Sequence, residues 1–206
     1  MRLSDLLQRD NNNLDIFRLI AAALVIYGHA YAIAPQEGHS DVLVHLLGYD
    51  YSGSLAVKLF FFLSGLVVTN SLLHKRDVAQ FVIARFFRIW PALLVVTALC
   101  ALVLGPLVTA LPLADYWSDP QTWRYVTGNL RLSPQYALPG VFADNPHAHV
   151  VNGSLWTIVL EVGAYMALLA LFMVGALRSR WLALGIVALV LLDPLVGNRL
   201  LFTWRV

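Results

Sequence analysis

Two side chains suited to anion binding and proton transfer stand in one apolar stretch near the start of the chain, FRLIAAALVIYGHA at residues 17–30. Arg18 and His29 are eleven positions apart. On a helix they lie within about 20° of one face and about 16 Å apart along the axis. Titratable groups inside a membrane helix usually mark a pathway or a reaction, and the shared face of these two favours a functional role. Two plainer interpretations stay open: Arg18 as an anchor in the headgroups and His29 as a packed polar side chain.

A carboxylate, Glu161, lies in a later apolar stretch. The helical rise places Glu161 about 10 Å below the outer membrane face and His29 about 9 Å below it. A carboxylate beside an imidazole fixes its tautomer and raises its basicity, as a general base requires. We therefore expect the two side chains to meet if their helices are neighbours. The alternative is a protonated glutamate that is hydrogen-bonded to a neighbouring helix.

Arg85 and Arg88 are three positions apart, so they share one helical face. Two guanidiniums held in this way can clamp phosphate oxygens, although they also suit ordinary membrane anchors. Lys58 suits a side chain that reaches the interface as well as it suits a ligand-binding group. Ser64 supplies a small side chain for close helix packing, and no G-x-S-x-G setting supports a nucleophilic role for it. The histidines show no metal-ligand spacing, so no metal site is predicted.

Composition places these residues in a membrane. Of 206 residues, 59% are hydrophobic and 13% charged, and the mean hydropathy is +0.71. Soluble domains are about 45–50% apolar, and here the apolar residues gather in blocks that match a bilayer core about 30 Å thick. The sequence predicts an all-α polytopic membrane helix bundle with about five spans. The lipid bilayer is its expected partner, and nothing suggests nucleic-acid binding.

The apolar blocks predict the elements that carry these groups. The expected spans are residues 14–34, 55–73, 91–110, 154–177 and 181–196. Residues 78–90 suit a short interfacial helix with Asp77 as its N-cap, and Pro91 suits the first turn of the third span. Residues 111–153 form a long loop without a clear helical period.

The positions of Lys and Arg predict the orientation. Most of the 14 Lys and Arg residues flank the same ends of the spans, whereas loop 35–53 has none. The N-terminus is therefore expected in the cytoplasm, with loops 35–53 and 111–153 facing outward. The leading segment has no net positive charge, so the first stretch is expected to stay as a span and not to be cleaved as a signal peptide.

Four motifs in order resemble one family. LDIFRLIAAALVIYGHA carries an arginine and a histidine separated by ten residues, LAVKLFFFLSGLVVTNSLL has a Phe-Phe-x-x-Ser-Gly element, and FVIARFFRIWPALL has Arg-x-x-Arg-x-x-Pro. SLWTIVLEVGAY contributes Trp156, Glu161 and Tyr165. From Leu14 to Leu177 the chain resembles the amino-terminal part of acyltransferase family 3, which comprises multi-span inner-membrane enzymes that O-acylate extracytoplasmic glycans.

The resemblance implies roles for these residues. His29 would be the general base for an acceptor hydroxyl, with Glu161 near it, while Arg18, Arg85 and Arg88 would suit the phosphates of a cytosolic acyl-CoA, acetyl-CoA in the simplest case. The acceptor would be a saccharide, no tightly bound cofactor is implied, and the location would be the bacterial inner membrane.

The family has about ten spans, so residues 1–206 would form the amino-terminal part of one larger membrane domain. A second half or another protomer would then complete it. Two alternatives stay open: a transporter or flippase for a glycan carrier, and an inactive fragment. Donor binding needs the pair Arg85 and Arg88, whereas a flippase has no special use for it.

Overall fold

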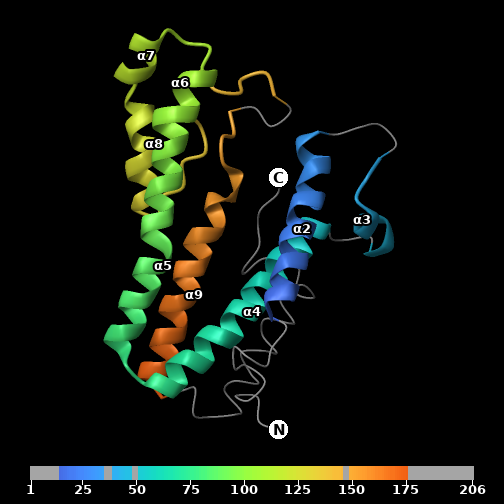
Figure 1. The fold of residues 1–206 in the computed structure, drawn as a ribbon, viewed down its shortest axis with the longest axis vertical. Helices are drawn as coiled ribbons and strands as arrows, with labels where there is room; N and C mark the ends of the chain where they lie inside the picture. The colour runs from blue at the N-terminus through green and yellow to red at the C-terminus, as the bar shows by residue number, and fades with distance from the viewer. Residues whose placement is uncertain (1–13, 35–38, 48–50, 146–148, 176–206) are drawn as a thin grey trace. The chain divides into compact units, whose positions relative to one another are not determined.

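A computed structural model describes residues 14–34, 39–47, 51–145 and 149–175. Within those ranges every regular element is helical, which confirms the all-α prediction. In chain order the elements are α2 (Leu14–Ile33), α3 (Val42–Leu47), α4 (Ser52–Lys75), α5 (Val78–Leu99), the π-helix η2 (Cys100–Leu104), α6 (Gly105–Val108), α7 (Leu113–Ser118), α8 (Pro120–Leu130), the 3₁₀ turn η3 (Gly153–Leu155) and α9 (Trp156–Met173) (Figure 1).

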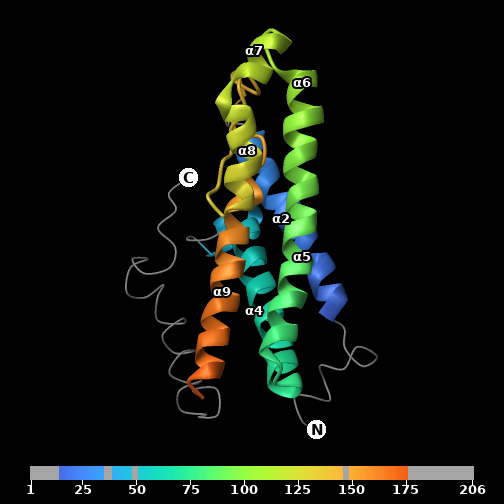
Figure 2. The same ribbon diagram turned by 90° about the vertical axis from the view of Figure 1, so that its left-hand side faces the viewer.

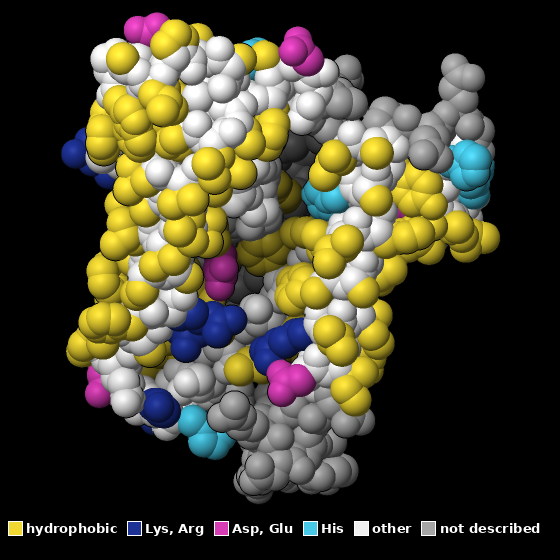
Figure 3. Space-filling model, turned by 45° about the horizontal axis from the view of Figure 1, so that its top comes forward, with side chains coloured by type: hydrophobic (Ala, Val, Ile, Leu, Met, Phe, Trp, Pro, Cys, Tyr) yellow, Lys and Arg dark blue, Asp and Glu magenta, His cyan; other side chains and the backbone are white. Residues whose placement is uncertain are grey.

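Four helical stretches in the described residues are long and apolar enough to cross a membrane. They are Leu14–Tyr31, Ser52–Lys75, Val78–Val108 and Gly153–Met173. Many large apolar side chains are exposed on these helices, and they are spread over the face in Figure 3, as lipid-facing helices require. The chain is therefore a polytopic membrane protein. The fifth span predicted at 181–196 lies outside the described residues.

The chain divides into two units, Met1–Glu161 and Val162–Val206, with the boundary inside α9. The first unit carries every predicted site residue except Tyr165. The site below is therefore built from the first unit alone.

Helices α2 and α4 pack along each other through small residues. Gly28 of α2 and Gly53 of α4 are both buried, and a Cβ on Gly28 would overlap the backbone nitrogen of Gly53. Close backbone approach of this kind is how membrane helices associate without a hydrophobic driving force between them. The two helix backbones therefore approach closely at these two glycines. At Gly65, beside Ser64, a Cβ would meet no described atom within 4 Å.

Helix α5 corrects two predictions about the third span. Residues 78–90 are not a separate interfacial helix, because α5 runs unbroken through Pro91 and continues through η2 and α6 to Val108. Pro91 consequently lies inside the helix and not in its first turn. A proline in an apolar helix costs one backbone hydrogen bond, and the surrounding helical turns keep their own. The predicted N-cap is confirmed, because the Asp77 carboxylate accepts a hydrogen bond from the Gln80 N–H at 2.9 Å.

Residues 111–153 also differ from the expected loop, because they contain α7, α8 and η3. The sequence does carry a helix-start pattern for α8, an aspartate followed by a proline. Asp119 caps the helix by accepting from the Gln121 N–H at 2.8 Å, and Pro120 lies in the first turn. Helix α8 then packs along α5, as both ribbon views show (Figures 1 and 2).

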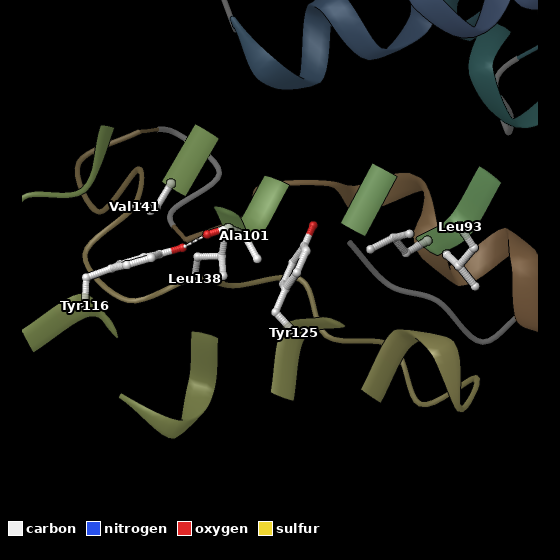
Figure 4. Close-up of a cluster of buried hydrophobic side chains, with 7 residues drawn as sticks. Leu93, Ala101, Tyr116, Tyr125, Leu138 and Val141 are labelled. Carbon is white, nitrogen blue, oxygen red and sulfur yellow. Dashed lines mark hydrogen bonds between the residues drawn. The ribbon is translucent and has the colours of Figure 1, made fainter. Parts of the chain in front are cut away.

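A buried aromatic cluster holds α7 and α8 against the α5–η2 helix. Its members are Leu93, Ala101, Tyr116, Tyr125, Leu138, Val141 and Leu155. The Tyr116 hydroxyl donates to the Ala101 carbonyl at 2.7 Å, within the π-helical turn (Figure 4). A π-turn leaves its carbonyls displaced from the regular ladder, so a side-chain donor there satisfies a buried acceptor. The cluster thus fixes the connection that leads into α9.

Candidate functional site

His29 is half-buried on α2 and faces the start of α4. Its Nδ1 lies 2.8 Å from the backbone carbonyl oxygen of Val25, one helical turn earlier. The Tyr51 ring packs edge-on to the imidazole, with centroids 6.1 Å apart and planes at 66°. The ring therefore has a fixed partner for one nitrogen and an aromatic neighbour on the facing helix.

Gly53 of α4 lies against this ring. A Cβ at this position would lie 3.0 Å from His29 Nδ1, 3.1 Å from its Cε1 and 2.6 Å from the Tyr51 ring carbon Cε2. Real Cβ atoms rarely approach so closely, so only glycine fits here without displacing a neighbour. The ring and the α4 backbone are thus in direct contact.

The α4 start that carries Tyr51 and Gly53 is held by a buried carboxylate. Asp41 is 3% exposed and accepts from the Ser52 N–H at 2.7 Å, from the Ser52 hydroxyl at 2.7 Å and from the Leu43 N–H at 2.8 Å. Burial by itself would raise the pKa of the Asp41 carboxyl, but these hydrogen bonds outweigh it and hold that pKa below its ordinary value. Asp41 is therefore an ionised cap shared by α3 and α4.

A second cluster of predicted residues lines a cavity of about 410 Å³ between α5 and the start of α9. Arg88 and Glu161 supply its charged groups. The rest of the lining is mixed: Ile89, Ala92, Leu93, Val96, Leu155 and Ile158 are apolar, and Asn152, Ser154 and Thr157 are polar. The cavity can hold a partly apolar molecule with a negatively charged or hydrogen-bonding part.

The three predicted anion-binding arginines have different surroundings. Arg88 is exposed and lines the cavity, whereas Arg85 is half-buried with its guanidinium 6.0 Å from the centroid of the Phe81 ring. Arg18 pairs with Asp15 at 3.0 Å, one turn away on α2. An exposed pair of this kind contributes little stability, so the Arg18 guanidinium is available for another anion at small cost.

The remaining predicted residues lie on α4 and α9 and are not among the residues that line the cavity. Ser64 is half-buried and Lys58 exposed on α4, while Trp156 begins α9 and Tyr165 is a buried residue of α9 in the second unit. Among the described residues no group of three or more His, Cys, Asp or Glu is placed to hold a metal ion.

The structure thus brings Arg88 and Glu161 to one cavity and places His29 at the contact between α2 and α4. The meeting of His29 with Glu161 stays a prediction. Sequence reasoning missed Gly53, Val25 and Asp41. Val25 could have been found, because a carbonyl four residues before a helical histidine is within reach of its ring. Gly53 and Asp41 act through tertiary contacts, for which spacing along the chain carries no signal.

The comparisons with known proteins agree with this architecture. The family model described as the acyltransferase domain matches residues 11–205. The O-acetyl transferase of Shigella phage Sf6 is 29% identical over 156 residues, which cover 76% of this chain and 44% of that protein. Nodulation protein 10 of Rhizobium leguminosarum bv. viciae is 30% identical over 175 residues, with 76% of this chain and 43% of that protein covered. The chain thus spans less than half the length of these relatives. No solved structure matches.

Proposed function

Because the chain belongs to the acyltransferase domain family, we propose that it carries part of a membrane O-acyltransferase. The enzyme transfers an acyl group, acetyl in the simplest case, from acyl-CoA to a hydroxyl of an extracytoplasmic saccharide. The single observation that carries this proposal is the family match over residues 11–205. The name of the phage relative supports an acetyl group.

His29 is the general base in this proposal. The acceptor hydroxyl loses its proton to the imidazole as its oxygen bonds to the thioester carbonyl carbon. The carbon–sulfur bond then breaks, and the thiolate leaves with the proton that the imidazolium returns. The products are the O-acyl saccharide and free CoA, so the imidazole ends neutral and no redox partner is needed.

The basic side chains are assigned to the donor. Arg18, Arg85 and Arg88 offer planar guanidiniums that match phosphate oxygens, and Arg88 opens onto the mixed cavity. In this assignment the phosphates of acyl-CoA lie on the cytoplasmic side, and the acyl end reaches inward along the cavity. Glu161 is proposed to orient and charge-balance the imidazolium that forms during transfer.

The proposal places the protein in the bacterial inner membrane with its N-terminus in the cytoplasm. No tightly bound cofactor is required. A second set of spans, from the same gene or from another protomer, completes the passage for the saccharide.

Replacing His29 tests the base. Membranes of cells that express the complete gene are given labelled acetyl-CoA and glycan, and acyl-glycan is measured. His29→Ala should abolish transfer, a loss of about 100-fold or more, while the protein still inserts. Normal transfer by this variant would remove His29 from the mechanism.

The donor assignment needs a separate test. Arg85→Ala combined with Arg88→Ala should raise the KM for acetyl-CoA about tenfold or more, because charge-assisted contacts to phosphate are lost. Arg124→Ala, at an exposed position of α8, is the matched control and should leave KM unchanged. An unchanged donor titration in the double variant would return both arginines to an anchoring role.

A further inference from the structure

We propose that Gly53 is a positioning residue for His29: with no side chain there, the ring stays against the Val25 carbonyl and Nε2 is the nitrogen that carries the lone pair. This inference rests on the proposed role of His29 as a base, and it identifies which nitrogen takes the proton and what prepares it.

The Val25 contact fixes the tautomer. A backbone carbonyl only accepts hydrogen bonds, so Nδ1, at 2.8 Å from the Val25 oxygen, carries the ring hydrogen. A neutral imidazole has one N–H, and its other nitrogen, Nε2, therefore holds the lone pair. The same carbonyl accepts the helical N–H of residue 29 with its other lone pair, so the ring bond costs the helix nothing.

Gly53 keeps the ring in this place. The edge formed by Nδ1 and Cε1 faces the Gly53 α-carbon, at the spacing where a Cβ would stand 3.0 and 3.1 Å away. The same Cβ would press on the Tyr51 ring from 2.6 Å. Tyr51 itself packs edge-on to the imidazole, so displacing it adds to the displacement of His29. Any side chain at position 53 thus displaces the Tyr51 ring and presses on the imidazole, and in our proposal this pressure weakens the bond to the Val25 carbonyl and admits the other tautomer.

The tautomer is measured without acyl transfer. The protein expressed from the complete gene is prepared in lipid nanodiscs with histidine labelled by ¹⁵N in the ring, and the His29 signals are assigned by their loss in His29→Gln. The ¹⁵N shifts of wild type at neutral imidazole should show Nδ1 protonated and Nε2 bare. Gly53→Ala should shift these signals toward the opposite or a mixed tautomer. Gly65→Ala, on the same helix where a Cβ meets no described atom within 4 Å, should leave them unchanged.

Activity provides the second readout, in membranes that express the complete gene. Gly53→Ala should lower kcat about tenfold or more, with the KM for acetyl-CoA within about twofold of wild type, because a displaced base affects the transfer step and not donor binding. Gly65→Ala should retain wild-type kcat.

The two readouts separate the possible failures. A wild-type spectrum with Nδ1 bare would overturn the inference, even if Gly53→Ala fails to fold. Loss of kcat in Gly53→Ala with an unchanged His29 tautomer would also overturn it, since Gly53 would then act only on overall packing. Full activity of His29→Ala would instead overturn the proposed function and leave the tautomer result standing.

Discussion

Asp41→Asn provides a sharp test of how the α4 start is held. The carboxylate accepts three hydrogen bonds, and its two oxygens divide them: Oδ1 serves Leu43 N–H and the Ser52 hydroxyl, and Oδ2 serves Ser52 N–H. An asparagine has one carbonyl oxygen. Turned one way it leaves the Ser52 N–H facing an NH₂ group, and turned the other way it leaves the Leu43 N–H without an acceptor. In either orientation one N–H loses its partner.

The magnitude follows from that loss. A buried donor left unsatisfied costs about 1–3 kcal/mol, and the two remaining bonds lose their charge assistance. We expect Asp41→Asn to lower the free energy of unfolding by about 2–3 kcal/mol at neutral pH. The exposed Asp115→Asn is the control and should change it by less than about 0.5 kcal/mol. Unfolding by SDS in mixed micelles, followed by helical circular dichroism, measures both variants beside wild type.

The effect of pH gives the second half of the test. The pKa of Asp41 is lower in the folded state than its ordinary value. The stability that the ionised carboxylate adds is therefore fully present above the unfolded pKa of about 4. The contribution disappears as the pH falls through the lower folded value. The gap between wild type and Asp41→Asn should therefore be constant from about pH 7 to 5 and shrink below about pH 4. Equal stability at pH 7, or a gap that grows in acid, would refute the role of Asp41 as an ionised cap.

Three further predictions use the same unfolding measurement. Tyr116→Phe removes the hydroxyl that donates to the Ala101 carbonyl at 2.7 Å, so it should cost about 1–2 kcal/mol; no loss would mean that the π-turn satisfies this carbonyl in another way. Arg76→Gly should stabilise the chain by about 1 kcal/mol, because residue 76 ends α4 with φ 51°; a loss would show that the charge matters more than the backbone. Gly105→Ala should destabilise more than Gly65→Ala, because its Cβ would overlap the Tyr116 hydroxyl, and equal effects would contradict the tight packing there.

Much of the architecture could be read from the sequence because it follows from local chemistry. Apolar blocks of spanning length predicted the helices, and the Asp77 cap was visible as an acid just before one of them. Pro91 misled the reading of α5, since the rule that proline starts or breaks a helix describes helices in water. In an apolar surrounding, the backbone has no water as an alternative hydrogen-bond partner, so the helix continues past the bond that proline cannot make.

Helix α8 shows a different reason for failure. Its sequence, PQTWRYVTGNL, has few apolar residues. Its hydropathy pattern therefore indicates a loop, although the segment is helical. Its buried Tyr125 belongs to the cluster with Leu93 and Ala101, and its buried Thr122 donates a hydrogen bond to the Tyr116 carbonyl at 2.7 Å. The helix is stabilised by its cap at Asp119 and by the cluster around Tyr116, and the second of these depends on residues far away in the chain.

The candidate site likewise contains residues that the sequence could indicate and contacts that it could not. Residue type made His29, Glu161 and the arginines candidates, because titratable groups are costly in an apolar helix. The groups that contact His29 could not be found by type, since a glycine and a backbone carbonyl look ordinary in any sequence. They become visible only when α2 and α4 are brought together.

The contact between α2 and α4 at His29 has to suit both the membrane and the proposed chemistry. In lipid, helices associate by close backbone approach, which Gly28 and Gly53 permit. The same setting demands that a polar ring nitrogen find its partner inside the protein, and the Val25 carbonyl is that partner. Satisfying the nitrogen on the helix side leaves the other one with its lone pair directed elsewhere. In the proposed function, that second nitrogen takes the proton of the acceptor hydroxyl.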